Sequence, residues 1–226
     1  MAEHRPVAEH RQLRFAPPQG ATTILLVRHG ESAAFVEGQP FALVDGHADP
    51  PLRENGLEQA QRVGERLAGE DIAAIYVTTL QRTAQTAAPL AARLGLEPRV
   101  EADLREVNLG EWENGGLRKH ARAGHPTVAQ IFAEQRWDVV PGAEPTDAFT
   151  DRVRAGIERI ATAHPDQTVV AVVHGGVIGS VLAQATGSQG LAFAGADNGS
   201  ISEVVITAER WIVRRYNDTA HLADAA

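Results

Sequence analysis

The sequence predicts an α/β protein in which helices cover both faces of a mostly parallel β-sheet, giving a three-layer α/β/α sandwich. Two observations lead to this prediction. Apolar segments of strand length alternate with segments whose apolar residues recur every three or four positions, as on one face of a helix. The chain has 226 residues, of which 43% are hydrophobic, enough for one large core. We therefore expect one domain over residues 21–226, preceded by an arm over residues 1–20.

Two strand and helix pairs are expected in the first half of the chain. The first strand covers residues 22–27 and the second covers residues 72–77, both rich in apolar side chains. A segment with helical spacing follows each strand. The apolar positions are Leu57, Ala60, Val63 and Leu67 in the first helix, and Ala84, Ala87, Ala91 and Leu94 in the second. Gly95 is the expected end of the second helix, because glycine readily adopts the left-handed conformation found there.

The second half of the chain continues the alternation. A helix with Thr146 as its expected N-cap carries Phe149, Val153, Ile157 and Ile160 on one face. The most continuous apolar strand covers residues 168–173 and leads into His174, Gly175 and Gly176. A helix with Val177, Val181 and Leu182 follows, and residues 201–206 and 211–216 are expected to close the sheet as a hairpin.

Composition excludes several classes of protein. The chain has no cysteine, so disulfides, thiolate metal sites and cysteine nucleophiles are excluded. A formal net charge of −8 argues against a nucleic-acid partner. The apolar runs are far shorter than the roughly 20 residues of a membrane span, and no secretory signal is visible, so we expect no membrane partner and a cytoplasmic location. His4 and His10, in a doubled Ala-Glu-His-Arg sequence, are interpreted as part of a solvated tail.

Charged and imidazole side chains follow three of the predicted strands. Arg28 and His29 follow the first, Arg82 the second, and His174 the long strand. Because the carboxyl ends of parallel strands share one edge of the sheet, we expect these groups to converge there. Two guanidinium groups and two imidazoles suit a phosphoryl group, which a neutral imidazole can attack at phosphorus. Glu106 is the best candidate for the general acid and base.

Several motifs in this order resemble those of the histidine phosphatase superfamily, with its phosphoglycerate mutase-like fold. The resemblance covers about residues 22–222. It rests on Leu26-Val27-Arg28-His29-Gly30-Glu31-Ser32, Gly46-His47-Ala48-Asp49-Pro50-Pro51-Leu52, Leu80-Gln81-Arg82-Thr83-Ala84-Gln85-Thr86-Ala87, Leu104-Arg105-Glu106, Pro141-Gly142-Ala143-Glu144 and Val172-Val173-His174-Gly175-Gly176.

The resemblance implies a role for each matched residue. His29 would be the phosphorylated nucleophile, with Arg28, Arg82 and His174 forming the phosphate pocket and Glu106 as proton donor. It also implies a reaction without metal or cofactor. Ser32, Gly175 and Phe35 are further candidates for substrate binding.

Two departures from the family pattern bear on the substrate. Phe35 stands where the family usually has an asparagine, and residues 35–44 are largely apolar, so the substrate is expected to carry an apolar group or the loop to close differently. Family mutases tend to carry an arginine pair after the proton donor, whereas this chain offers Arg118, Lys119 and Arg122. This difference favours a phosphatase over a mutase.

Three functions therefore remain open. The favoured one is a metal-independent phosphomonoesterase acting on a small phosphorylated metabolite. The others are a phosphoglycerate mutase-type phosphotransferase and a catalytically silent phosphoryl-binding module. A homodimer is left open. Trp112 and Trp137 are interpreted as packing residues, Lys119 as a solvated charge, and Asp49 and Asn198 as turn or capping residues.

Overall fold

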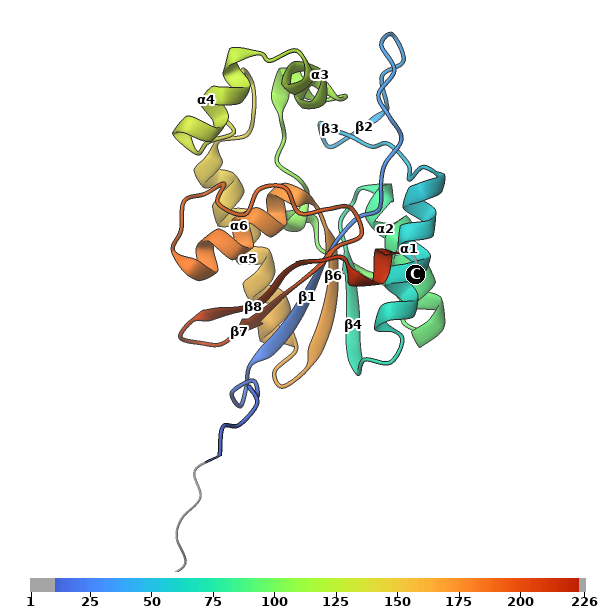
Figure 1. Ribbon diagram of the computed structural model, residues 1–226, viewed down its shortest axis with the longest axis vertical. Coiled ribbons are helices and arrows are strands. Elements are labelled where there is room, and N and C mark those ends of the chain that lie inside the picture. Colours follow the sequence, from blue (N-terminus) through green and yellow to red (C-terminus); the bar gives the residue numbers. More distant parts are fainter. Residues whose placement is uncertain (1–10, 224–226) are drawn as a thin grey trace, which may run out of the picture.

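A six-stranded β-sheet with the strand order β5-β4-β6-β1-β7-β8 forms the centre of the computed structural model, which describes residues 11–223 (Figure 1). The sheet consists of β1 (Thr22–Arg28), β4 (Ile72–Val77), β5 (Arg99–Val100), β6 (Thr168–Val173), β7 (Ile201–Ile206) and β8 (Trp211–Asp218). A separate two-stranded ribbon pairs β2 (Leu43–Val44) with β3 (His47–Ala48). The helices are α1 (Glu54–Leu67), α2 (Gln81–Leu94), α3 (Gly116–Arg122), α4 (Pro126–Glu134), α5 (Thr146–Ala163) and α6 (Gly175–Thr186), with short 3-10 turns at Ala102–Leu104, Gly110–Trp112 and Ala220–Leu222.

Strand pairing confirms the mostly parallel sheet. β6 lies between β1 and β4 and runs parallel to both, and β4 is also parallel to β5. On the other side of β1, β7 and β8 pair antiparallel as the expected closing hairpin. β1, β4 and β6 therefore end at the same edge, which places the segments that follow them side by side.

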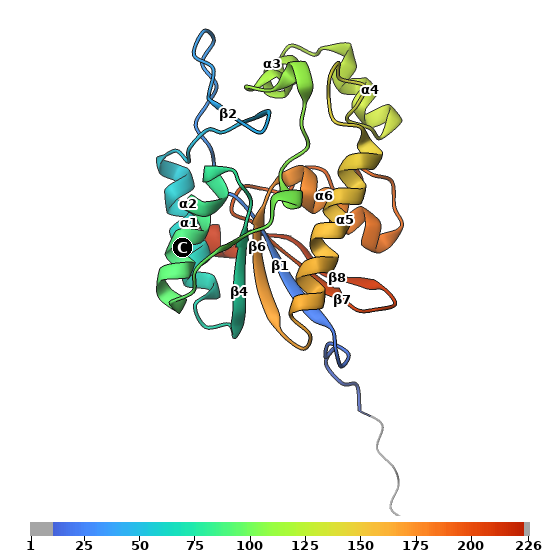
Figure 2. The same ribbon diagram turned by 180° about the vertical axis from the view of Figure 1, so that it is seen from behind.

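Helices cover both faces of the sheet, as the hydrophobic pattern predicted (Figures 1 and 2). Side chains of β1 alternate between the two faces. Ile24 and Leu26 pack with apolar residues of α5 and α6, whereas Leu25 and Val27 pack with those of α1 and α2. A strand buried on both faces reads as a continuous apolar run, which explains the composition of residues 22–27.

Two residues, Gly95 and Thr146, were expected to cap the ends of helices. Gly95 ends α2 in the left-handed conformation, with φ of 66°, as predicted. Thr146 was wrongly expected to cap α5. It is the first helical residue, after Pro145, and its hydroxyl instead bonds the Trp137 amide and the Asp138 carboxylate. The turn before the helix uses this hydroxyl, so it does not serve the free amides of the helix.

A cap that the hydrophobic pattern did not reveal lies beyond the carboxyl ends of the strands (Figure 1). It consists of the loop between β1 and α1 and of residues 110–145, which contain α3 and α4. Its own small core contains Trp112, Ile131 and Val140, with Trp137 packed against them, so both tryptophans pack as expected. The cap lies over the edge of the sheet at which β1, β4 and β6 end.

Residues 11–20 are exposed and contain no helix or strand. They contact the domain where Phe15 lies under the Arg214 guanidinium and where the Gly20 amide donates to Asp166. The division at residue 20 stays a prediction, and His4 and His10 lie outside the described residues. Across residues 11–223, no helix combines the length and the apolar character needed to cross a membrane.

Candidate active site

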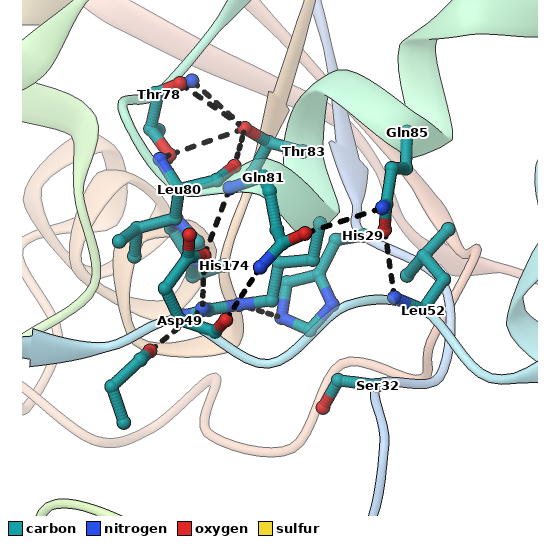
Figure 3. Close-up of polar contacts among 12 residues, drawn as sticks. His29, Ser32, Asp49, Leu52, Thr78, Leu80, Gln81, Thr83, Gln85 and His174 are labelled. Carbon is teal, nitrogen blue, oxygen red and sulfur yellow. Dashed lines mark hydrogen bonds and ion pairs between the residues drawn. The ribbon is translucent and has the colours of Figure 1, made fainter. Parts of the chain in front are cut away.

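The three loops singled out in the sequence meet at one edge of the sheet (Figure 3). His29 follows β1, Arg82 lies in the first turn of α2 after β4, and His174 lies between β6 and α6. The Arg82 Nε atom donates to His29 Nε2 at 3.3 Å. The imidazoles of His29 and His174 meet edge to face, with ring centroids 5.2 Å apart. The predicted convergence of these three side chains is therefore observed.

Close packing of two loops fixes the backbone around His29. A Cβ atom added to Gly30 would lie 2.3 Å from the Gly56 carbonyl oxygen, so only glycine fits there. The Gly30 amide donates to Thr86 Oγ1 in α2 at 3.0 Å. The His29 amide donates to the Val173 carbonyl of β6 at 3.0 Å. The segment after β1 is thus attached to both neighbouring loops.

Hydrogen bonding determines which His29 nitrogen carries the proton. Nδ1 lies 2.7 Å from the Gly30 carbonyl oxygen, which can only accept, so Nδ1 is the protonated atom. Nε2 is then the acceptor for Arg82 Nε. Its lone pair, the nucleophilic electron pair of a neutral imidazole, lies beside a guanidinium group that can bind an anion.

Burial and positive charge keep both imidazoles neutral. Burial, followed by the charges of Arg82 and Arg28, lowers the pKa of His29 well below its ordinary value near 6.5. The pKa of His174 is lowered in the same way, by burial first and then by Arg82 and His29. His29 is 5% exposed and His174 is fully buried. Burial also lowers the pKa of Arg28 and of Arg82, but both guanidinium groups stay charged.

These lowered pKa values predict a loss of stability in acid. As the pH falls through 6.5, the unfolded chain binds protons that the folded protein does not take up at His29 and His174. Above pH 6.5 the contribution of these histidines to the free energy of unfolding is complete. Below pH 6.5 the free energy of unfolding decreases by about 1.4 kcal/mol per pH unit for each of them. Urea unfolding from about pH 7.5 to 5.5 measures the slope. The slope for His174→Asn should be shallower by one such contribution, and an unchanged slope would show that His174 is not held neutral.

A cavity of about 210 Å³ lies between the sheet edge and the cap. Six of the predicted site residues line it: Arg28, His29, Ser32, Phe35, Arg82 and Glu106. Phe35 also packs against Gly115 of the cap, where an added Cβ atom would lie 2.5 Å from the Phe35 Cβ. The remaining wall is mostly apolar and includes Phe41, Pro50, Val107, Leu109, Trp112 and Leu117. The site therefore joins a cationic floor to an apolar wall.

Glu106 is held at the boundary of the cavity by backbone donors. Its Oε1 accepts from the Val107 amide at 3.0 Å and its Oε2 from the Gly176 amide at 3.1 Å. A Cβ atom on Gly176 would lie 2.4 Å from Oε1, so glycine at this position admits the carboxylate. Glu106 reaches a second cavity of about 190 Å³, which Arg28 and Gly175 also line.

His174 lies behind the cavity and does not line it. Its Nε2 atom is 3.1 Å from Thr78 Oγ1, and its Nδ1 atom is buried without a hydrogen-bond partner among the described residues. The ring therefore supports His29 from the side of the sheet in this structure. Gly175 likewise lines the second cavity rather than the first.

Three polar residues around the site were not predicted to act there. Asn198 was interpreted as a turn or capping residue, but its side-chain Nδ2 atom donates to the His29 carbonyl at 2.9 Å. Asp49 accepts from the Gln81 amide at the start of α2, as a capping residue would, and also lies 3.8 Å from Arg82 Nη1. Thr78 Oγ1 contacts His174 Nε2. Asn198 and Asp49 come from loops distant in the sequence, and no local pattern indicates their partners.

The cap contributes one cation to the cavity. Arg118 lines it, with Nη2 3.5 Å from Ser32 Oγ. Lys119 instead forms an exposed ion pair with Glu37 at 2.8 Å, which agrees with its interpretation as a solvated charge. Within residues 11–223, no group of three or more His, Asp or Glu side chains is arranged to hold a metal ion.

Known proteins share the sequence pattern and the fold of this chain. Residues 24–219 match the model of the histidine phosphatase superfamily (branch 1). The phosphoglycerate mutase-like protein 4 of Arabidopsis thaliana is 33% identical over 89% of this chain and 87% of its own. The metal-independent phosphoserine phosphatase of the same plant is 30% identical over 89% and 84%. The structure of a mycobacterial glucosyl-3-phosphoglycerate phosphatase has a TM-score of 0.73 at 26% identity, covering 88% of this chain and all of that one.

Proposed function

The chain belongs to branch 1 of the histidine phosphatase superfamily and is a phosphatase, and we propose that it hydrolyses a small phosphomonoester through a phosphohistidine on His29. The observation that carries this proposal is the state of His29 Nε2. Its lone pair is free of a proton and lies at the floor of a cavity beside Arg82. The silent phosphoryl-binding module considered from the sequence is therefore set aside.

The first half of the reaction forms a covalent intermediate. Arg28 and Arg82 bind the phosphoryl oxygens. The Arg82 Nε–H group, which donates to His29 Nε2 in this structure, turns to a phosphoryl oxygen, and the released Nε2 lone pair attacks phosphorus. The N–P bond forms while the ester P–O bond breaks, and the leaving alkoxide takes a proton from the Glu106 carboxyl group. The neutral His29 makes this attack possible near neutral pH, because no proton has to leave Nε2 first.

The second half of the reaction restores the enzyme. The Glu106 carboxylate accepts a proton from water, whose oxygen attacks phosphorus as the N–P bond breaks. One water molecule is consumed for each phosphate released, and His29 and Glu106 return to their starting protonation states. Apart from the substrate and water, the proposed cycle uses only groups of this chain.

The cavity supports a substrate with an apolar part. Phe35 stands where the family usually has an asparagine, and Phe35, Phe41 and Trp112 all line the cavity that Arg28 and Arg82 also line. Arg118 adds one positive charge in the cap, whereas Lys119 is paired with Glu37. One cap cation instead of an arginine pair favours hydrolysis over mutase activity. Two of the proteins that resemble this chain are named for phosphoserine and glucosyl-3-phosphoglycerate, both phosphomonoesters with further polar groups.

A phosphate-release assay tests the proposal and separates it from the mutase. The panel should contain phosphoserine, 3-phosphoglycerate and phosphomonoesters with alkyl or aromatic groups. We expect phosphate release from several members, faster for those with an apolar group, and no dependence on a bisphosphoglycerate primer. Interconversion of phosphoglycerates that requires the primer, without phosphate release, would show a mutase instead.

A further inference from the structure

Arg152 of α5 lies behind the proposed proton donor and uses every N–H group of its guanidinium. Nε and Nη2 donate to the two carboxylate oxygens of Glu144 at 2.6 and 2.8 Å. Nη1 donates to the carbonyls of Asp103 and Arg105 at 2.7 and 2.8 Å. Nη2 also donates to the Glu106 carbonyl at 2.8 Å. One side chain therefore holds three carbonyls of the segment that carries Glu106.

This segment has little regular structure of its own. Glu106 lies between the 3-10 turns at Ala102–Leu104 and Gly110–Trp112, outside every helix and strand. The Glu106 carbonyl accepts one more bond, from His47 Nε2 at 3.0 Å. The Val107 and Gly176 amides bind the Glu106 carboxylate itself, but no β-ladder fixes the backbone of residues 105–107. The side-chain donors of Arg152 and His47 therefore help to determine where this backbone, and the carboxylate that it carries, lies.

Arg152 is itself firmly anchored. Its side chain and that of Glu144 are each 17% exposed, and the guanidinium lies over the Phe149 ring at 4.9 Å. Burial opposes ionisation of the Glu144 carboxyl, but hydrogen bonds and charge from Arg152 outweigh it and keep the pKa of Glu144 below its ordinary value. Glu144 also accepts from the Asn108 amide at 3.3 Å, so the ion pair holds the segment on both sides of Glu106.

We propose that Arg152 is the positioning residue of the proton donor: it sets the position of the Glu106 carboxylate without touching the substrate. Arg152 does not line the cavity that contains His29. The inference rests on the proposed function, in which Glu106 protonates the leaving group. A small displacement of a general acid lowers the rate only where protonation limits the reaction. Loss of Arg152 should therefore affect substrates according to their leaving group.

The substitution Arg152→Lys tests this role, because lysine keeps the charge but has three donors on a single atom and cannot reproduce the planar fork. We expect kcat/KM for an alkyl phosphate to fall about tenfold or more, and that for p-nitrophenyl phosphate, whose leaving group needs no proton, to fall less than about threefold. KM and inhibition by vanadate should stay near their wild-type values. Glu144→Gln, which weakens the anchor of Arg152, should show the same pattern with a smaller loss.

Arg159→Lys is the matched control. Arg159 lies on the same helix and pairs with Glu101 and Asp103, but it does not contact residues 105 or 106. We expect its losses on the two substrates to be equal. Suppose that Glu106→Gln lowers kcat/KM for the alkyl phosphate much more than that for p-nitrophenyl phosphate. If Arg152→Lys and Glu144→Gln then lower kcat/KM equally for the two substrates, the positioning role of Arg152 is wrong, while the proposed function stands. If Glu106→Gln does not discriminate, the proposed function fails at its acid step.

Discussion

Replacing His29 with alanine is expected to lower phosphate release by on the order of 10⁴-fold or more with every substrate. The imidazole is the only group that the proposal bonds to phosphorus, and Arg82 Nε directly contacts its Nε2 atom. The alkali-stable phosphoenzyme of the wild type should be absent from the variant. Rapid mixing with radiolabelled substrate, followed by an alkaline quench, measures both quantities in one experiment.

His164→Gln is the control for loss of a buried imidazole. His164 is 5% exposed and lies between α5 and β6, at the end of the sheet opposite the cavity, where it contacts Tyr76 and Gln167. This variant should form the phosphoenzyme at the wild-type level. If His29→Ala hydrolyses p-nitrophenyl phosphate as fast as the wild type, the covalent mechanism is wrong.

The substitution Glu106→Gln should have the second largest effect, with a strong dependence on the leaving group. The amide keeps the shape of the side chain but has no acidic proton. We expect kcat/KM for alkyl phosphates to fall about 10²–10³-fold and that for p-nitrophenyl phosphate to fall only a few-fold. A series of phenyl phosphates whose leaving groups differ in acidity measures this dependence. The plot of log kcat/KM against the pKa of the leaving group should be steeper for Glu106→Gln than for the wild type.

Glu111→Gln provides the comparison, because Glu111 is an exposed carboxylate in the neighbouring 3-10 turn. Its slope should equal that of the wild type. Equal losses across the series for Glu106→Gln would contradict the role of Glu106 as general acid and leave it a role in binding or folding.

The layered core could be predicted from the sequence because its elements bury large apolar faces. Residues 24–27 and 169–173 are apolar throughout, and α5 repeats Phe149, Val153, Ile157 and Ile160 at helical spacing. The cap could not be predicted in the same way. α3 has seven residues, none of them buried, so it has no apolar stripe to detect. Its position depends on contacts with other segments, such as that between Gly115 and Phe35.

The same distinction applies to the candidate site. Arg28, His29 and Arg82 were predictable because each lies at or shortly after the end of a strand and carries reactive or anion-binding chemistry. Asn198 and Arg152 were not, because their roles consist of hydrogen bonds to backbone carbonyls of distant segments. Every residue has a backbone carbonyl, so the sequence around the acceptor does not indicate that a distant side chain binds it.

The pairing of β1 has a consequence for synthesis of the protein. Both neighbours of β1 in the sheet, β6 and β7, come from residues 168–206. At about 5–20 residues per second, the ribosome needs about 9–34 s to reach β7 after it has made His29. During that time the β1 edge that pairs with β7 lacks its native partner, and the other edge lacks its partner until β6 has been made. Unpaired edges of this kind are sites at which chains aggregate or bind chaperones. The catalytic loop, although it is encoded early, is therefore assembled among the last parts of the molecule.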